Sequence, residues 1–324
     1  MKHGLLWTAV VCSLVLSGAS RAQISGDHTL VGILEEVPGA YAGEKSHFGV
    51  RVAFEQNLRG WRTFPFKCGN PGCLVSVTEK YPRETRWTVS SNGRILGTVL
   101  ARTPANFAFY SHVGIQTVAD GEKVPTVGDR LTDYSGFLES PVQRPLLATA
   151  GAPKLGPAHG GWKLGPLDPR DAKRVWPLFR RLVPLIDDCR LDARGEYIPS
   201  NGRAPKFVEL EIASTWVNRA DDKLLYARIR PEAFKECDGP MSHRSAYWYY
   251  RQSNGAVWLL PGQDTFAADT TGPFAELIMP LEFVDLLGDG NDEALFLMAG
   301  YDAGGYALFY DGFRKVTTFQ WIYH

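Results

Sequence analysis

Short runs in which apolar and polar side chains alternate dominate this chain. Phe48, Val50, Val52 and Phe54 are separated by small or polar residues, and the same alternation recurs at Val208, Leu210 and Ile212. Because successive side chains of a strand point to opposite faces of a sheet, this alternation is typical of half-buried strands. Further strand-like runs are expected at 73–79, 85–90, 94–100, 106–110, 225–229, 246–251, 256–260, 294–299, 306–310 and 315–322.

The turns between these runs predict antiparallel hairpins. Asn92-Gly93, Asn254-Gly255 and Asp311-Gly312 each follow an aromatic run, and such pairs favour the positive φ angles of a tight hairpin. This recurrence indicates either a degenerate repeat or chance reuse of common hairpin chemistry. We predict a mainly β fold, with a propeller-like or two-lobed antiparallel β architecture.

One segment has the periodicity of a helix. Asp168 is a candidate N-cap, Pro169 suits the first turn, and the apolar residues that follow form one stripe, with the basic residues largely off it. We predict one short helix near 169–187, bent or interrupted at Pro177 and Pro184. It is interpreted as a helix packed on the sheet, and a membrane-seeking helix is the alternative.

The composition of residues 141–168 suggests a division of the chain. This segment has many Pro, Gly and Ala residues and little periodicity, so it is expected to be a linker or long loop. It separates an N-terminal β region at 23–140 from a C-terminal β region at 169–324.

The first 22 residues have the features of a cleaved secretory signal peptide. Lys2 precedes a short apolar run, and small residues at Ser20 and Ala22 suit a cleavage site. The apolar run is short for a membrane-spanning helix. We therefore expect a secreted or periplasmic protein.

Four cysteines follow this segment: Cys68, Cys73, Cys189 and Cys237. An even number of cysteines in an exported chain predicts two disulfides. The Pro71-Gly72 pair suits a tight turn that favours a Cys68–Cys73 bond, with Cys189–Cys237 as the second, and the crossed pairings stay open.

The charge of the chain narrows the classes of partner. Cleavage after residue 22 would remove two of the 35 basic residues and none of the 35 acidic ones, which leaves a nearly neutral protein. Such a balance predicts neither nucleic acid nor anionic lipid as a partner. No segment after residue 22 is apolar enough to insert into a membrane. With nucleic acid and lipid disfavoured, the expected ligand is an unknown protein or a carbohydrate.

The candidate chemistry lies in a short acidic segment near the C-terminus. Between Asp285 and Glu293, carboxylates alternate with glycines, and an apolar strand is expected on either side. Calcium binds six to eight oxygen ligands, which a tight turn of this composition can supply. We predict calcium as the cofactor, with the carboxylates of Asp285, Asp289 and Glu293 as candidate ligands.

Over about residues 281–299 this segment resembles the FG-GAP/VCBS type of repeat, in which an acidic, glycine-rich turn joins two strands. The resemblance implies a structural calcium site in a propeller blade, with the backbone carbonyl of Asn291 as one ligand. Leu287 departs from the pattern because the family normally has an oxygen ligand there. The positions that match are Asp285, Gly288, Asp289, Gly290 and Glu293.

These features favour an exported, non-catalytic β protein with a calcium-stabilised hairpin, acting as a binding or scaffolding module. The alternative is a secreted or periplasmic hydrolase acting on polysaccharide or peptide. Glu209 and Glu211 are spaced for one strand face and are candidate acids for it, but cross-strand pairing with Arg228 and Arg230 explains them more simply. The aromatic run 248–250 suits core packing better than sugar stacking.

Overall fold

The computed structural model describes most of the chain. The described residues are 29–37, 45–57, 60–64, 81, 83–104, 113–128, 130–131, 142–151, 155–186, 190–191, 194, 197–198, 203–234, 246–263, 276–299 and 303–322. The expected signal segment 1–22, the strand-like runs 73–79 and 106–110, and the four cysteines considered for disulfides lie outside these residues.

The N-terminal part forms a barrel. Six strands close on themselves because β1 pairs with both β9 and β2, and β3 extends the sheet beyond β2. The alternating side chains place Val50, Val52 and Trp87 in the interior of the barrel. The strands in sheet order are β1 (Thr29–Val37), β9 (Leu146–Ala150), β4 (Glu84–Ser91), β5 (Arg94–Arg102), β6 (Ile115–Val118), β2 (His47–Asn57) and β3 (Gly60–Thr63).

The C-terminal part forms two five-stranded antiparallel sheets. The central sheet consists of β10 (Gly156–Pro157), β18 (Glu276–Asp285), β19 (Glu293–Ala299), β20 (Ala303–Tyr310) and β21 (Lys315–Ile322). The outer sheet consists of β11 (Lys163–Leu164), β14 (Leu210–Val217), β15 (Lys223–Ile229), β16 (Ala246–Arg251) and β17 (Val257–Leu259). Each is a four-stranded meander whose first strand also pairs with a short strand from residues 155–164.

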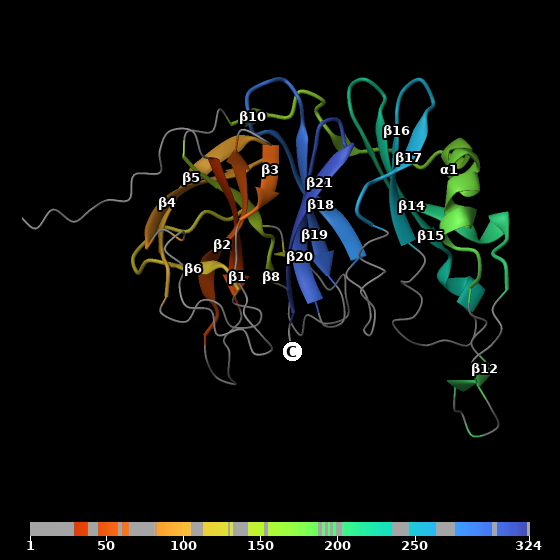
Figure 1. Ribbon diagram of the computed structural model, residues 1–324, viewed down its shortest axis with the longest axis horizontal. Coiled ribbons are helices and arrows are strands. Elements are labelled where there is room, and N and C mark those ends of the chain that lie inside the picture. Colours follow the sequence, from red (N-terminus) through yellow and green to blue (C-terminus); the bar gives the residue numbers. More distant parts are fainter. Residues whose placement is uncertain are drawn as a thin grey trace, which may run out of the picture.

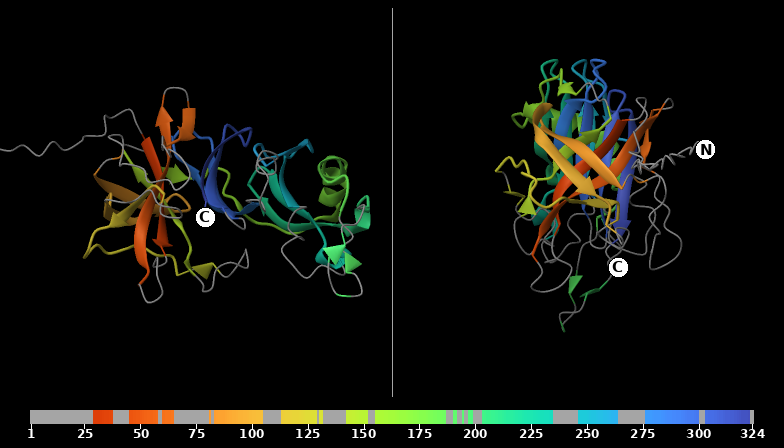
Figure 2. Two further views of the ribbon diagram at one scale, coloured as in Figure 1. Left: turned by 60° about the horizontal axis from the view of Figure 1, so that its bottom comes forward. Right: turned by 90° about the vertical axis from the view of Figure 1, so that its left-hand side faces the viewer.

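Helix α1 (Pro169–Leu182), the outer sheet, the central sheet and the barrel lie in a row (Figures 1 and 2). Phe179 of α1 packs on one face of the outer sheet, and Trp248 and Phe296 meet between the two sheets. Leu308 of the central sheet packs with Ile33 on the outside of the barrel. Three apolar clusters therefore join these layers into one body, and a fourth fills the barrel.

Helix α1 begins at its predicted cap, where Asp168 accepts a hydrogen bond from the backbone N–H of Arg170. The helix continues through Pro177 and ends at Leu182, shortly before Pro184. No helix among the described residues is long and apolar enough to cross a membrane. The remaining short elements are β7 (Arg130–Leu131), β8 (Val142–Gln143), β12 (Arg190–Leu191), β13 (Tyr197–Ile198), η2 (Phe207–Glu209) and η3 (Pro231–Phe234).

The prediction of a mainly β, antiparallel fold with one short helix is confirmed. All three predicted hairpin turns join paired strands. Within 141–168, the segment expected to be a linker or long loop, residues 146–150 instead form the fully buried strand β9. Its five apolar and small residues fill the barrel wall, and the prolines that suggested a loop flank it.

The barrel and the central sheet are joined at the tip of the β4–β5 hairpin. Asn92 and Gly93 have φ angles of 51° and 68°, and the Gly93 N–H donates to the buried Glu282 carboxylate at 2.8 Å. Gly93 also packs on strand β10, where a Cβ atom would lie 2.3 Å from the Pro157 Cα. Only glycine combines this backbone angle with so close an approach.

We expect Gly93→Ala to lower the free energy of unfolding by about 2 kcal/mol or more, through both backbone strain and this clash. Gly312→Ala is the matched control, because Gly312 has a φ angle of 62° and nothing lies within 4 Å of its added Cβ. It should cost only about 1 kcal/mol. Urea unfolding measures both free energies. Equal destabilisation by the two substitutions would show that the contact between hairpin and sheet adds nothing to stability.

Candidate functional site

Five connections gather at one end of the two sheets (Figure 1). The register places them together, since Gly156 pairs with Asp285 and Lys163 pairs with Val217. We call them the loop rim, and they comprise residues 158–162, 218–222, 252–256, 286–292 and 311–314.

The predicted acidic hairpin is part of this loop rim and joins β18 to β19. Asp285 and Glu293 stand at its base and are both buried. The Asp285 carboxylate accepts the N–H groups of Asp289 and Gly290 at 3.1 and 3.0 Å. Glu293 accepts the Leu286 N–H at 2.8 Å. The loop therefore satisfies its two buried carboxylates with its own backbone.

The exposed part of the hairpin has the backbone expected of a glycine-rich turn. Gly288 and Gly290 have φ angles of 63° and 87°, which favour glycine. Asp289 accepts the Asn291 N–H at 2.9 Å, and both side chains are exposed. Leu287 packs against the apolar cluster between central sheet and barrel, so it contributes to the core.

Four carboxyl groups lie close together in this hairpin and repel one another when they are ionised. Burial raises the pKa of Glu293 to about 7, and repulsion by Asp289, Asp285 and Asp292 adds to that rise. The hydrogen bond from Leu286 acts in the opposite direction. Near the base, the Nδ1 of His159 lies 3.4 Å from the Asp285 carboxylate.

Asp292, which the sequence analysis passed over, connects the hairpin to the rest of the loop rim. Its two carboxylate oxygens accept the backbone N–H groups of His159 and Gly160 at 2.7 and 2.9 Å. The indole N–H of Trp162 donates to it at 3.1 Å. The next connection joins the same network, because the Arg219 N–H donates to the Gly160 carbonyl at 2.7 Å.

The outer sheet has a similar arrangement. Asn218 accepts the N–H groups of Ala220 and Asp222, and so closes its own loop. Asp222 accepts the Ser253 N–H at 2.8 Å and the Tyr250 hydroxyl at 2.9 Å. Asn and Asp side chains at turn ends can be recognised in the sequence because they bond to nearby backbone groups. Their partners in other loops cannot be recognised in this way.

These contacts decide how well the hairpin fits a calcium ion. In the described part of the chain no group of three or more His, Cys, Asp or Glu side chains could hold a metal ion. Asp292 faces the segment 158–162. An ion at this turn would have to replace hydrogen bonds that Asp285 accepts from the loop backbone.

The residues considered for hydrolysis have structural partners. Glu211 pairs with Arg228 across the strands, as expected. Glu209 lies in η2 and pairs with Arg203 instead of Arg230, and hydrogen bonds from Arg203 lower the pKa of its carboxyl. The aromatic run 248–250 is buried in the sheet cores, in agreement with the packing interpretation.

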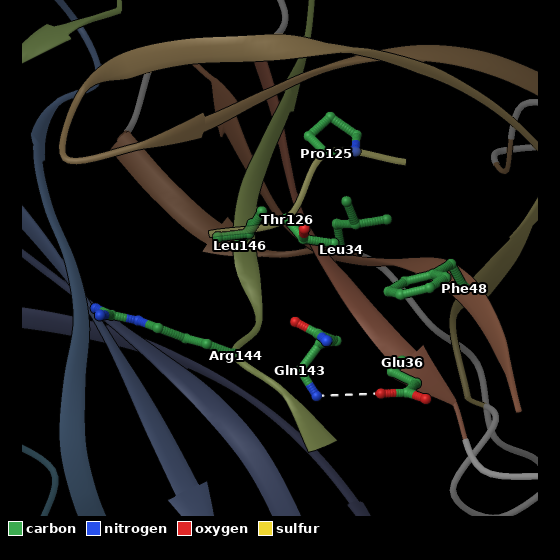
Figure 3. A pocket seen from close by; sticks show the side chains of 8 residues that line it. All are labelled: Leu34, Glu36, Phe48, Pro125, Thr126, Gln143, Arg144 and Leu146. Atoms are coloured by element: carbon green, nitrogen blue, oxygen red, sulfur yellow. Dashed lines mark hydrogen bonds between the residues drawn. The ribbon is translucent and has the colours of Figure 1, made fainter. Parts of the chain in front are cut away.

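A small hollow lies within the barrel wall, between β1, β2 and β9, where Gln143 donates its backbone N–H to Glu36 (Figure 3). Arg144 points away from it and donates to the Leu281 carbonyl of the central sheet. The hollow has room for about 10 Å³, the space of about one water molecule, so it does not accommodate a substrate. Its lining residues are Leu34, Glu36, Phe48, Pro125, Thr126, Gln143, Arg144 and Leu146.

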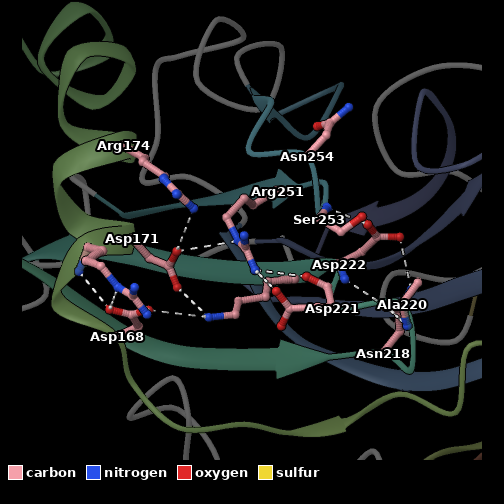
Figure 4. Close-up of polar contacts among 12 residues, drawn as sticks. Asp168, Asp171, Arg174, Asn218, Ala220, Asp221, Asp222, Arg251, Ser253 and Asn254 are labelled. Atoms are coloured by element: carbon pink, nitrogen blue, oxygen red, sulfur yellow. Dashed lines mark hydrogen bonds and ion pairs between the residues drawn. The ribbon is translucent and has the colours of Figure 1, made fainter.

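A buried charged cluster lies where α1 begins (Figure 4). The Asp171 carboxylate meets the Lys223 Nζ at 2.8 Å and the Arg251 Nε at 3.4 Å. Arg251 also donates to Asp221, and a hydrogen bond from Arg251 lowers the pKa of that carboxyl. All three members of the Asp171–Lys223–Arg251 cluster are buried, so this cluster fastens the helix to the outer sheet.

Comparison with protein-family models, with curated proteins and with solved structures gives no significant match for this chain. The resemblance of residues 281–299 to the FG-GAP/VCBS repeat therefore stays a prediction.

Proposed function

We propose that this protein is a non-catalytic binding module that holds a carbohydrate or protein ligand at the loop rim. The observation that carries the proposal is the hydrogen bonding through Asp292 and Asp222, which fixes neighbouring loops to one another. Loops held rigid on a sheet scaffold are a common way to present contact residues. Exposed polar side chains remain available on this rim, among them His159, Asp289 and Asn291.

A binding role is favoured over hydrolysis by the state of the carboxylates. Glu211 and Glu209 are ion-paired, and Asp171 holds a helix in place. A hydrolase needs a pair of carboxyls, or a nucleophile and its base, facing a cleft that accepts substrate. The described residues considered for this role supply structural contacts instead.

Affinity electrophoresis in gels that contain soluble polysaccharides tests the proposal. A binding module is retarded by at least one polysaccharide without releasing reducing ends from it. His159→Ala with Asn291→Ala should remove the retardation, because both side chains are exposed on the loop rim. The matched control is Arg94→Ala with Lys123→Ala on the barrel, which should migrate like the parent protein. Release of reducing ends would instead establish the hydrolase alternative.

The proposal includes the calcium prediction for the acidic hairpin. Asp285, Asp289, Asp292 and Glu293 lie within one loop, and a divalent ion would offset their mutual repulsion. For a site with the modest affinity of extracellular modules, about 2 mM calcium should raise the melting temperature by about 2 to 4 °C relative to chelator. Differential scanning calorimetry with calcium or with EDTA measures this shift.

Asp289→Ala should abolish the calcium-dependent shift. The control is Asp311→Ala, which removes an exposed turn carboxylate that pairs with Lys315 in another hairpin. This control should keep the full shift. If calcium raises the melting temperature of the parent and of Asp289→Ala equally, the hairpin is not the calcium site. The binding role of the loop rim would still be tested by the electrophoresis.

A further inference from the structure

The nearly neutral total charge hides a local separation of charge around α1. Every exposed charged side chain between residues 163 and 185 is basic. The two acidic residues in this range are Asp168, which is half-buried and bonded to Arg170, and Asp171, which is buried in the charged cluster. The exposed basic residues are Lys163, Arg170, Lys173, Arg174, Arg180 and Arg181.

On the helix itself these basic residues share one face. Arg170, Lys173, Arg174, Arg180 and Arg181 follow the i, i+3, i+4 spacing that aligns side chains along a helix. We call this face the basic stripe. The opposite face, with Val175 and Phe179, packs on the outer sheet. The basic stripe therefore points away from the molecule, at the end farthest from the barrel (Figures 1 and 2).

The ion pairs of the basic stripe are concentrated at its start. Arg170 pairs with Asp168, and Arg174 lies 3.9 Å from Asp171. Lys173, Arg180 and Arg181 form no ion pair with any described residue. These three cations span about two helical turns and are thus available to an external anion.

Exposed apolar side chains border the basic stripe. Phe207 contacts Trp176, which is one helical turn from both Lys173 and Arg180, and the neighbouring Val208 is 72% exposed. Leu164, on the edge strand β11 of the outer sheet, is 67% exposed and lies beside Trp216, at the other end of β14. Five of the seven large exposed apolar side chains among the described residues lie in the segments 164–185 and 207–208: Leu164, Leu167, Leu185, Phe207 and Val208.

We propose that this face adsorbs to an anionic lipid bilayer, with the basic stripe at the headgroups and the bordering apolar side chains at the acyl boundary. Basic residues attract anionic lipid, and adjacent apolar side chains gain from entering the interface. A soluble polyanion would satisfy the cations but would give no role to Phe207 and Val208. The surface binds without insertion, which is compatible with the absence of a spanning helix among the described residues.

Co-sedimentation of the full chain with vesicles tests this proposal. We expect binding to phosphatidylcholine vesicles that contain about 30% phosphatidylglycerol, and none to phosphatidylcholine alone. Raising the salt from about 0.05 M to about 0.5 M should release the protein. Arg180→Glu with Arg181→Glu should lower the partition coefficient at least about 25-fold, since each basic residue near such a surface contributes roughly a fivefold change.

Two further variants separate lipid from other anions. Phe207→Ser with Val208→Ser should lower vesicle binding about tenfold through lost apolar contact. Arg94→Glu with Lys123→Glu makes the same change in net charge on the barrel and should leave binding within about twofold of the parent. Vesicle binding that is insensitive to the Phe207 and Val208 changes and is fully displaced by heparin would overturn the lipid assignment in favour of a soluble polyanion. No binding to the anionic vesicles would also overturn it.

Discussion

Asp171→Ala should destabilise the protein by about 3 to 5 kcal/mol, because it leaves two buried cations without their shared carboxylate. Lys223 and Arg251 are both buried, and the Lys223 ammonium lies 2.8 Å from Asp171. Asp221 still pairs with Arg251, but Lys223 keeps only the more distant Asp168 at 4.0 Å. Urea unfolding, followed by far-UV circular dichroism, measures the loss.

A second variant separates the charge effect from a simple loss of packing. Asp171→Leu combined with Lys223→Met removes both members of the closest pair and keeps apolar volume in the site. It should recover at least about half of the loss, since a buried ion pair replaced by apolar groups is often nearly neutral. Glu84→Ala removes an exposed partner of Arg102 and should cost less than about 1 kcal/mol. A small loss for Asp171→Ala would show that the cluster is not what fastens α1.

Stability should fall as the pH rises from about 5 to about 7, and Glu282 should account for about 2 to 3 kcal/mol of that fall. Burial raises the pKa of Glu282 to about 7 from the usual 4.5, against the smaller opposing effect of the Gly93 hydrogen bond. In this pH range the unfolded chain has lost the proton that the folded protein retains. Folding is therefore favoured below the unfolded pKa, and that contribution disappears as the pH passes the folded pKa.

Glu282→Gln tests this assignment because the amide cannot ionise yet can still accept the Gly93 N–H. Urea unfolding at several pH values should show a shallower fall for the variant than for the parent protein. Glu84→Gln changes an exposed side chain and should leave the slope of unfolding free energy against pH unchanged. Parallel slopes for parent and Glu282→Gln would show that this carboxyl does not titrate in the range. Glu293 acts in the same direction in every variant, so the difference between slopes isolates Glu282.

Local patterns predicted much of this fold. Alternation located β2, β14 and β15, and Asn-Gly pairs located hairpins, because both are properties of a few neighbouring residues. Strand β9 was missed because its run is continuously buried on both sides and is flanked by prolines. Closure of the barrel was also not predictable, since it depends on β1 pairing with β9 far along the chain.

The sequence predicted which residue types form the acidic hairpin, but not which residues they contact. The glycines at 288 and 290 adopt the expected positive φ angles. The part played by Asp292 was not foreseen, because its partners lie more than 100 residues away in segment 158–162. The basic stripe was hidden for a related reason: a whole-chain charge balance cannot show which acids are buried.

The order of the layers differs from the order of the chain, and this affects synthesis. The central sheet lies between the barrel and the outer sheet, yet four of its five strands are the last part of the described sequence to be made, from residue 276 onward. Until they leave the ribosome, the outside of the barrel and the inner face of the outer sheet both expose apolar surface. The two halves can therefore be joined only after residues 276–322 have been synthesised. A chain truncated before residue 276 would leave both apolar surfaces exposed and prone to aggregation.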